Sequence, residues 1–286
     1  MPTISKPLDT HVVEILRLLQ RAGGDCFLIG AMARQILLSN VHGQPPGHAT
    51  VDLDFAVAVE SWSAYDAIKE RLIQSSDQML PGKAPHKLLY RIPVDPKIYK
   101  PGFIDYPVDI IPFEGVEDGH GIIKWPPDAA IHMGVSGYRE TSENTVEVQI
   151  DADLRIRVAS LAAVAMLKIF AWHDRWTETN RDAQDLTTIL RQYGATGNSG
   201  RPYEDAYLET LERYGYDPDI TWAWLLGQDI RSLARPKTLA DILVILDDDG
   251  KFQRLLDHMA PFFSDESALE AALNALKEGM TQPLVT

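Results

Sequence analysis

The sequence contains a single cysteine, Cys26, so it cannot form an internal disulfide bond, and this favours a reducing compartment. It lacks an apolar run as long as a membrane-spanning helix requires. The first residues, MPTISKPLDTHVVEILRLL, show no basic start followed by an apolar stretch and a small-residue cleavage site, so we interpret them as an amphipathic helix. We therefore expect a cytoplasmic protein without membrane association.

Basic residues are scarce, because 27 lysines and arginines face 41 acidic residues and the net charge is −14. This charge argues against a protein that coats nucleic acid nonspecifically. The balance is reversed in residues 81–101, where Asp95 is the one acidic residue. That segment either receives a polyanionic substrate or is a solvated basic loop, and composition leaves both open. Its basic residues are Lys83, Lys87, Arg91, Lys97 and Lys100.

Several sequence signatures of enzymes are missing. There is no Gly-x-x-x-x-Gly-Lys loop, which argues against a Walker-type ATPase. There is no Gly-x-Ser-x-Gly elbow, which argues against a serine hydrolase of that design. The eight histidines show no close metal-ligand spacing, so a histidine-based metal centre is not indicated.

The hydrophobic pattern predicts an α+β region followed by a helical one. The chain of 286 residues allows one large domain or two ordinary ones. We predict a domain over 1–158 with a small mixed sheet and an all-helical domain over 159–286. In the first domain we expect helices at 9–22, 31–38 and 62–75, a loop at 77–87, and strands at 26–30, 50–59, 87–94, 106–113, 144–150 and 154–159.

From residue 160 onward, helical periodicity replaces the strand pattern. Asp217 followed by Pro218 is typical of a helix start, with a capping side chain and proline at the first position. The predicted helices of this domain cover 160–175, 180–193, 203–214, 218–233, 237–247, 251–259 and 265–279.

Two aspartates interrupt the apolar run VDLDFAVAVE at residues 51–60. Asp52 and Asp54 face the same way in a strand, and their repulsion is costly unless a cation lies between them. A third carboxylate, Asp109, lies in another apolar strand, YPVDIIPF. Gly30 joins a strand to a helix, and glycine there lets backbone N–H groups approach a phosphate. Together they predict a site for Mg²⁺ and a nucleotide, with room for two ions about 4 Å apart.

Each of these residues also has a structural interpretation. Gly30 alone is compatible with an ordinary strand–helix turn, and the aspartates with an exposed sheet edge. Lys168 lies in a helix that is apolar almost all round, so its ammonium either meets a carboxylate or phosphate or extends to water. With Thr179 as the helix N-cap, Asp182 falls at the capping-box position, and Asp185 also favours the helix start. Arg175 either forms an ion pair with one of these aspartates or contacts substrate.

The pattern of Gly30-Ala31, Asp52 with Asp54, and Asp109 resembles the nucleotidyltransferase-fold superfamily. Within it, the stretch LKIFAWHDRWTETNRDAQDLTTIL at 167–190 resembles the AbiEii-type predicted nucleotidyltransferases, many of which are toxins of bacterial toxin–antitoxin or phage-defence pairs. The resemblance covers residues 10–195. Two positions depart from it, since Ala31 stands where the family often has serine or glycine, and Arg181 where lysine is common.

The resemblance implies roles for individual residues. Asp52 and Asp54 would bind Mg²⁺, with Asp109 as third ligand or base. Lys168 would contact phosphates or orient a carboxylate, as a fourth catalytic residue. The residues expected to bind the nucleotide are Gly30, Ala31, Arg34, Lys168 and Arg175.

The expected activity is Mg²⁺-dependent transfer of a nucleoside monophosphate from a nucleoside triphosphate (NTP) to a hydroxyl group, with release of pyrophosphate. The resemblance makes a tRNA 3′ end a candidate acceptor, beside a protein side chain or a small molecule. It also implies a toxin with a cognate antitoxin. Two alternatives stay open at this point. One is a nucleotide-binding or partner-binding protein that has lost turnover, for which Ala31 is the motivation, and the other is an antitoxin-like partner.

Overall fold

The computed structural model describes residues 1–47, 50, 52–263 and 265–285. The chain divides into two compact units. The first contains residues 1–36 and 48–159, and the second contains residues 37–47 and 160–286. The short segment 37–47 therefore lies with the helical unit, although it is flanked in sequence by elements of the first. The domain boundary proposed at 158/159 remains a prediction.

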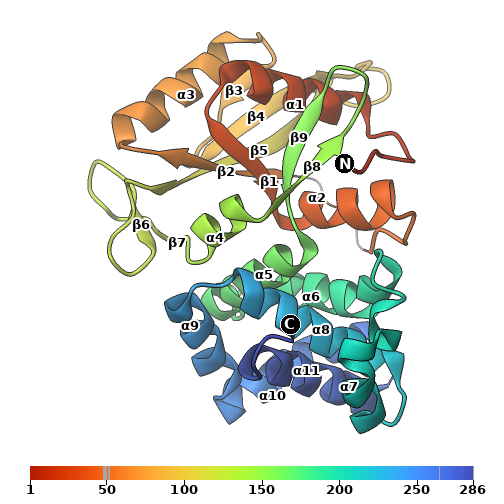
Figure 1. Cartoon of the computed structure of the whole chain (residues 1–286). Helices are drawn as coiled ribbons and strands as arrows, with labels where there is room; N and C mark the ends of the chain where they lie inside the picture. Colours follow the sequence, from red (N-terminus) through yellow and green to blue (C-terminus); the bar gives the residue numbers. More distant parts are fainter. Residues whose placement is uncertain (48–49, 51, 264, 286) are drawn as a thin grey trace. The chain divides into compact units, whose positions relative to one another are not determined.

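A mixed β-sheet is the centre of the first unit (Figure 1). Among the described residues it has seven strands in the order β3-β4-β5-β2-β1-β9-β8. The pairs β2/β5 and β1/β9 are parallel, and the other neighbours are antiparallel. The predicted α+β fold with a mixed sheet is thereby confirmed. The strands are β1 (Asp25–Ile29), β2 (Leu53–Val59), β3 (Met79–Pro81), β4 (Lys87–Pro93), β5 (Phe103–Glu114), β8 (Thr145–Gln149) and β9 (Arg155–Ala159).

Several short elements differ from the prediction. The segment 77–87, expected to be a loop, contains β3, which pairs with the edge of β4. A separate two-stranded ribbon, β6 (Ile122–Lys124) with β7 (His132–Gly134), and helix α4 (Tyr138–Glu143) were not anticipated. Elements of three to six residues carry too little periodicity to be recognised. The strand predicted from residue 50 begins at Leu53, and Val51 lies outside the described residues.

Helices cover the sheet on its two sides. On one side lie α1 (Thr10–Ala22) and α3 (Trp62–Gln74), which contact each other (Figure 1). Helix α3 begins where the Ser61 hydroxyl accepts a hydrogen bond from the Ala64 N–H at 3.2 Å. On the other side, the ring of Tyr138 in α4 packs 6.1 Å from that of Phe113. The apolar faces of these helices bury the strands, which keeps the sheet in one register.

Helix α2 (Gly30–Gln35) leaves β1 directly and continues as the π-helix η1 (Ile36–Val41). One α-helix over 31–38 was predicted, so its existence was recognised but the change of winding was not. Within η1, Leu37 and Leu38 are 4% and 0% exposed.

The second unit contains no strand within its described residues, which confirms the helical region. The predicted helix at 203–214 begins only at Leu208 and is preceded by the 3₁₀ turns η3 (Arg201–Tyr203) and η4 (Asp205–Tyr207). Asp217 caps the next helix as predicted, accepting from Asp219 N–H at 2.8 Å. The helices are α5 (Leu161–Arg175), α6 (Arg181–Gln192), α7 (Leu208–Arg213), α8 (Pro218–Leu233), α9 (Pro236–Leu246), α10 (Asp249–Met259) and α11 (Glu266–Thr281), with short turns η2 (Tyr193–Ala195) and η5 (Ala260–Phe262).

Helices α8 and α11 pack backbone against backbone. A Cβ added to Gly227 would overlap the carbonyl oxygen of Leu276, and a Cβ on Gly279 would overlap the carbonyl oxygen of Trp224. Real Cβ atoms do not come this close to backbone atoms, so only glycine fits at the crossing.

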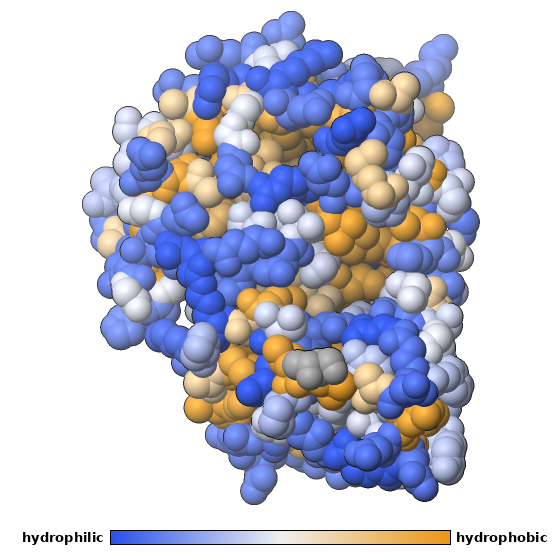
Figure 2. Space-filling view, in the orientation of Figure 1, coloured by the Kyte–Doolittle hydropathy of each residue, from blue (hydrophilic) through white to orange (hydrophobic). Residues whose placement is uncertain are grey.

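Figure 2 shows hydrophilic residues over most of the face in view, with hydrophobic residues in smaller areas among them. Across the described residues, we find no helix with both the length and the apolar character that a membrane crossing demands.

We predict that Gly227→Ala destabilises the protein by about 1–3 kcal/mol, because the added methyl group forces α8 away from α11. Urea-induced unfolding followed by circular dichroism measures this loss. Gly200→Ala is the matched control, since a Cβ there meets nothing within 4 Å and its φ of −84° suits alanine. Equal destabilisation by both substitutions would contradict the close crossing.

Candidate functional site

Two of the predicted site aspartates lie side by side in the sheet. Asp54 of β2 is paired with Asp109 of the parallel strand β5, and on its other side with Ile29 of β1. Paired residues in neighbouring strands point to the same side, and the strands lie about 4.8 Å apart. The structure thus brings the carboxylates of two separate strands together at the end of β1.

Gly30 follows Ile29 and lies against the carboxyl group of Asp54. Its φ is +69°, a region that favours glycine, and a Cβ there would overlap Oδ2 of Asp54 and lie 3.0 Å from its Cγ. Glycine is required at this position for the backbone conformation and also for the space. The backbone of Gly30 therefore lies in close contact with the Asp54 carboxyl group, and the sequence pattern predicted that these two residues are neighbours.

Asp52 is placed differently from the other two aspartates. It lies just before β2, and its Oδ1 accepts a hydrogen bond from the Thr50 hydroxyl at 2.7 Å. In the part of the chain that the structure describes, no group of three or more His, Cys, Asp or Glu side chains is arranged to hold a metal ion. The metal-binding role of Asp52 remains a prediction. Burial, followed by the charges of Asp52, Asp9 and Asp54, raises the pKa of Tyr106 to about 12.

Asp109 has a cationic partner that sequence reasoning did not assign. It is 9% exposed, and the Lys87 ammonium lies 3.0 Å from its Oδ1 and 2.9 Å from its Oδ2. Nε2 of His86 is 3.8 Å from Oδ2. Burial lowers the pKa of His86; Asp109 opposes this, and the ammonium of Lys87 reinforces it, so the pKa stays below its ordinary value. Lys87 is the in-register partner of Asp109 on β4, and only knowledge of that register would have identified it.

Two paired carboxylates are enough to contribute to a magnesium site, so a third is not required. Mg²⁺ is usually held by one or two carboxylates together with substrate phosphates. Asp54 and Asp109 supply such oxygen ligands on one side of the sheet, beside the glycine turn. For both oxygens of Asp109 to become available, the Lys87 ammonium has to move away from them.

The other residues predicted to bind the nucleotide in the first unit are less accessible. Ala31 is half-buried in α2 and carries no hydroxyl group. Arg34 is 0% exposed. A completely buried guanidinium presents no surface to a ligand, so its role in nucleotide binding remains a prediction.

Lys168 and Arg175 belong to the second unit, where they share a carboxylate. The Lys168 ammonium lies 2.9 Å from Oδ1 of Asp182 and 2.6 Å from Oδ2 of Asp185. Nε and Nη2 of Arg175 donate to Asp182 at 2.7 and 2.9 Å. Of the alternatives that the sequence left open for Lys168, the structure shows contact with carboxylates. Contact of Lys168 or Arg175 with a nucleotide stays a prediction.

Opposite charges in this cluster stabilise the ionised forms of Lys168 and Asp182. Burial lowers the pKa of Lys168, but Asp185 and Asp182 outweigh it, and the pKa lies above its ordinary value. Burial raises the pKa of Asp182, but Arg175 and Lys168 bring it down to about 2. The capping-box interpretation was wrong, because Asn180 is the N-cap residue of α6 and makes no side-chain cap bond.

Comparison with protein families gives a match over most of the chain. The model of the family described as nucleotidyl transferase AbiEii toxin, type IV toxin–antitoxin system, matches residues 17–275. The match includes the paired strands with Asp54 and Asp109 and also the cluster around Lys168. The comparison with curated proteins yields no match.

Two solved structures resemble the chain along nearly its whole length. One is an antigenic nucleotidyltransferase-like protein from Paracoccidioides brasiliensis, with 15% identity, 96% of this chain and 95% of that chain covered, and a TM-score of 0.45. The other is JHP933 from Helicobacter pylori, with 12% identity, 96% and 93% covered, and a TM-score of 0.36.

We predict that Gly30→Ala costs about 1–2 kcal/mol for the left-handed backbone alone, and more because the methyl group displaces the Asp54 carboxyl. Gly43→Ala is the matched control, since Gly43 has a φ of +71° and open space around it. Urea unfolding of the two variants separates the backbone effect from the contact. Equal losses would show that Asp54 does not lie against position 30.

We predict that acid removes the contribution of the Asp182 ion pairs. The folded-state pKa of about 2 lies below the ordinary 3.8, so this stability is present above pH 4 and is lost as the pH falls towards 2. The contribution is about 2 kcal/mol. Unfolding free energies of the native protein and Asp182→Asn, measured from pH 6 to pH 2, should converge at low pH. A constant difference would contradict this.

Proposed function

We propose, because the chain belongs to the family of AbiEii nucleotidyl transferase toxins of type IV toxin–antitoxin systems, that it transfers a nucleoside monophosphate from an NTP to a hydroxyl group. The observation that supports this most directly is the pairing of Asp54 with Asp109 beside Gly30. A metal-dependent nucleotidyl transfer needs carboxylate oxygens next to a place where phosphates can approach the backbone, and these residues offer both.

In the proposed reaction, the acceptor oxygen forms a bond to the α-phosphorus. The bond from that phosphorus to the bridging oxygen breaks, and pyrophosphate leaves. The hydroxyl proton passes to a carboxylate, for which we propose Asp109, or to water. Mg²⁺, held by Asp54 and Asp109 together with the substrate phosphates, would stabilise the charge that develops on the phosphoryl oxygens.

In this proposal the Asp109 carboxylate has two states, one paired with the Lys87 ammonium and one bound to a divalent cation. While the ammonium is paired with the carboxylate, it neutralises a charge that is largely shielded from water. A divalent cation held by Asp54 and Asp109 would supply the counter-charge in place of the lysine. Lys87 has a side chain that is 39% exposed, so its ammonium can turn towards solvent or towards a substrate phosphate.

The acceptor and the biological role belong to the same proposal. A tRNA 3′ end, a protein side chain and a small molecule are the acceptor classes to be tested. We propose that the protein acts as a toxin and that a cognate antitoxin restrains it, as the family description indicates.

A second candidate is a nucleotide-binding protein without turnover on the same fold. Two observations favour it: Ala31 lacks a hydroxyl group for a phosphate oxygen, and both oxygens of Asp109 are bound to Lys87. Such a protein would bind NTP and transfer nothing.

We predict that purified protein with Mg²⁺, each α-labelled NTP and a panel of total RNA, protein and small hydroxyl compounds incorporates label into one acceptor class. Asp54→Asn and Asp109→Asn should lower the rate by about a hundredfold or more, because the amide is a poor ligand and base. The matched control is Asp77→Asn, the same change at an exposed turn residue, which should leave the rate unchanged.

Three outcomes decide between the candidates. Label transfer that requires Asp54 and Asp109 supports the nucleotidyltransferase. NTP binding without transfer to any acceptor supports the second candidate. Growth arrest on expression that disappears in Asp54→Asn supports the toxin role, and growth arrest that survives the substitution contradicts it.

A further inference from the structure

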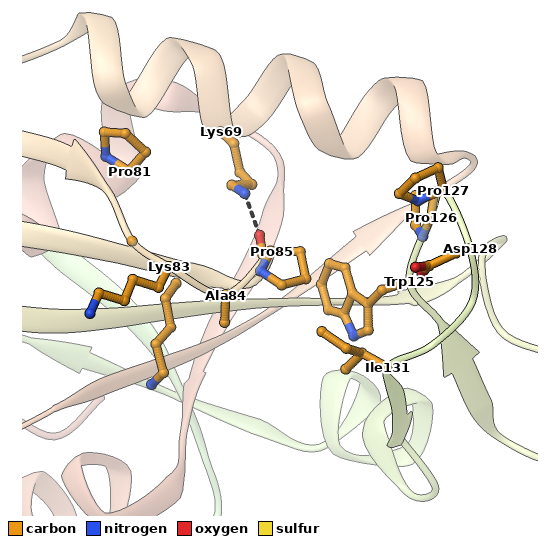
Figure 3. A pocket seen from close by; sticks show the side chains of 12 residues that line it. Lys69, Pro81, Lys83, Ala84, Pro85, Trp125, Pro126, Pro127, Asp128 and Ile131 are labelled. Carbon is orange, nitrogen blue, oxygen red and sulfur yellow. Dashed lines mark hydrogen bonds between the residues drawn. The ribbon is translucent and has the colours of Figure 1, made fainter.

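A cavity of about 360 Å³ in the first unit is shown in Figure 3, and Lys87, the partner of Asp109, is one of its lining residues. It is formed by helix α3, the connection from β3 to β4, and the segment that follows β6. Its volume lies within the range of small-molecule sites. Lys87 lines the cavity and contacts Asp109, so the cavity adjoins the proposed catalytic carboxylate.

Three lysines line this cavity: Lys69, Lys83 and Lys87. Over the described residues, neither Lys69 nor Lys83 forms an ion pair. The Lys69 ammonium donates to the Pro85 carbonyl and lies 5.4 Å from the ring centre of Tyr65, as Figure 3 shows for the first contact. Burial lowers the pKa of Lys69, and the charge of Asp66 opposes this without cancelling it. A partly desolvated ammonium with no carboxylate in ion-pair contact is stabilised by an anion.

Trp125 supplies an independent observation. It is 2% exposed, and its indole N–H has no hydrogen-bond partner in the structure. Its ring is fixed between those of Trp62, Tyr65 and His86, at 5.1, 5.5 and 5.7 Å. A buried donor without a partner is destabilising, and Trp125 lines the same cavity as the lysines.

We propose that this cavity is a phosphate-binding subsite, in which Lys69, Lys83, Lys87 and the Trp125 N–H hold the oxygens of a phosphoryl group. The polar side chains at the cavity are donors except for Asp128. That carboxylate is exposed, and its Oδ1 accepts from the Ala130 N–H at 3.0 Å, which stabilises the turn. A ligand with several anionic oxygens matches a set of donors, whereas a cation or a neutral apolar molecule does not.

The subsite is separate from the nucleotide site at Gly30. The in-register row across β1, β2, β5 and β4 runs Ile29, Asp54, Asp109, Lys87. Three strand spacings separate its ends, about 14 Å, so one phosphate group cannot contact both. The role of the subsite rests on the proposed function: it would hold a phosphate of the acceptor, or pyrophosphate after it has left the nucleotide site, which share this chemistry. Binding itself does not depend on that function.

The test measures binding without Mg²⁺ and NTP, by isothermal titration calorimetry of the full chain. The probes are inorganic pyrophosphate and the dinucleoside phosphodiester UpU. Lys83→Gln and Lys69→Gln should each weaken binding roughly threefold to tenfold. Lys97→Gln removes the same charge from an exposed lysine outside the cavity, and Asp54→Asn alters the nucleotide site; both should leave binding unchanged.

A second readout follows the buried donor directly. In a ¹⁵N–¹H correlation spectrum, the Trp125 Nε1–H signal, assigned with Trp125→Phe, should shift on addition of the bound probe. Binding of UpU identifies an acceptor phosphodiester as the source, and binding of pyrophosphate alone identifies the leaving group.

The proposal is overturned if neither probe binds, if Lys97→Gln weakens binding as much as Lys83→Gln, or if Asp54→Asn abolishes it. Phosphate binding that survives in a protein without transferase activity would refute the proposed function and leave the subsite intact.

Discussion

A carboxylate enclosed in an apolar sheet requires a positive charge beside it, and the Lys87 ammonium meets this requirement for Asp109. The proposed chemistry depends on this contact, because the same charge that stabilises the folded sheet competes with a metal ion for the same oxygens. Lys168 meets the requirement in the second unit, but there the counter-charges Asp182 and Asp185 are themselves almost fully buried. In the proposed function the first pair exchanges with a ligand, whereas the second pair needs no ligand to neutralise its buried charges.

The sequence predicted the architecture well where elements are long and their apolar pattern is continuous. The strands with Asp54 and Asp109, the hairpin of β8 and β9, and helices such as α8 were recognised because burial imposes a clear period on them. The association of Gly30 with Asp54 was also predictable. Glycine between a strand and a helix loses conformational entropy on folding, and a carboxylate in an apolar strand loses hydration, so both residues indicate a site.

What escaped prediction depends on pairing between distant segments. Lys87 was recognised only as part of a basic segment, because its partnership with Asp109 follows from the register of β4 on β5. The cavity escaped for the same reason, since Lys69, Lys83 and Trp125 come from three separate segments. The capping box expected at Asp182 was wrong because α6 begins one residue later than predicted, and Asp182 instead pairs with the buried Lys168 and the half-exposed Arg175.

The chain passes from the first unit to the second before residue 37, returns after residue 47, and leaves again after Ala159. The polypeptide therefore connects the two units at three places. Cutting it at any one peptide bond does not give two intact units. A fragment ending near residue 158 would carry segment 37–47 without the rest of the unit to which that segment belongs. Truncation is a common way to assign an activity to one half of an enzyme. Here a truncated protein would contain an incomplete unit, so its lack of activity would not show which unit carries the catalytic residues.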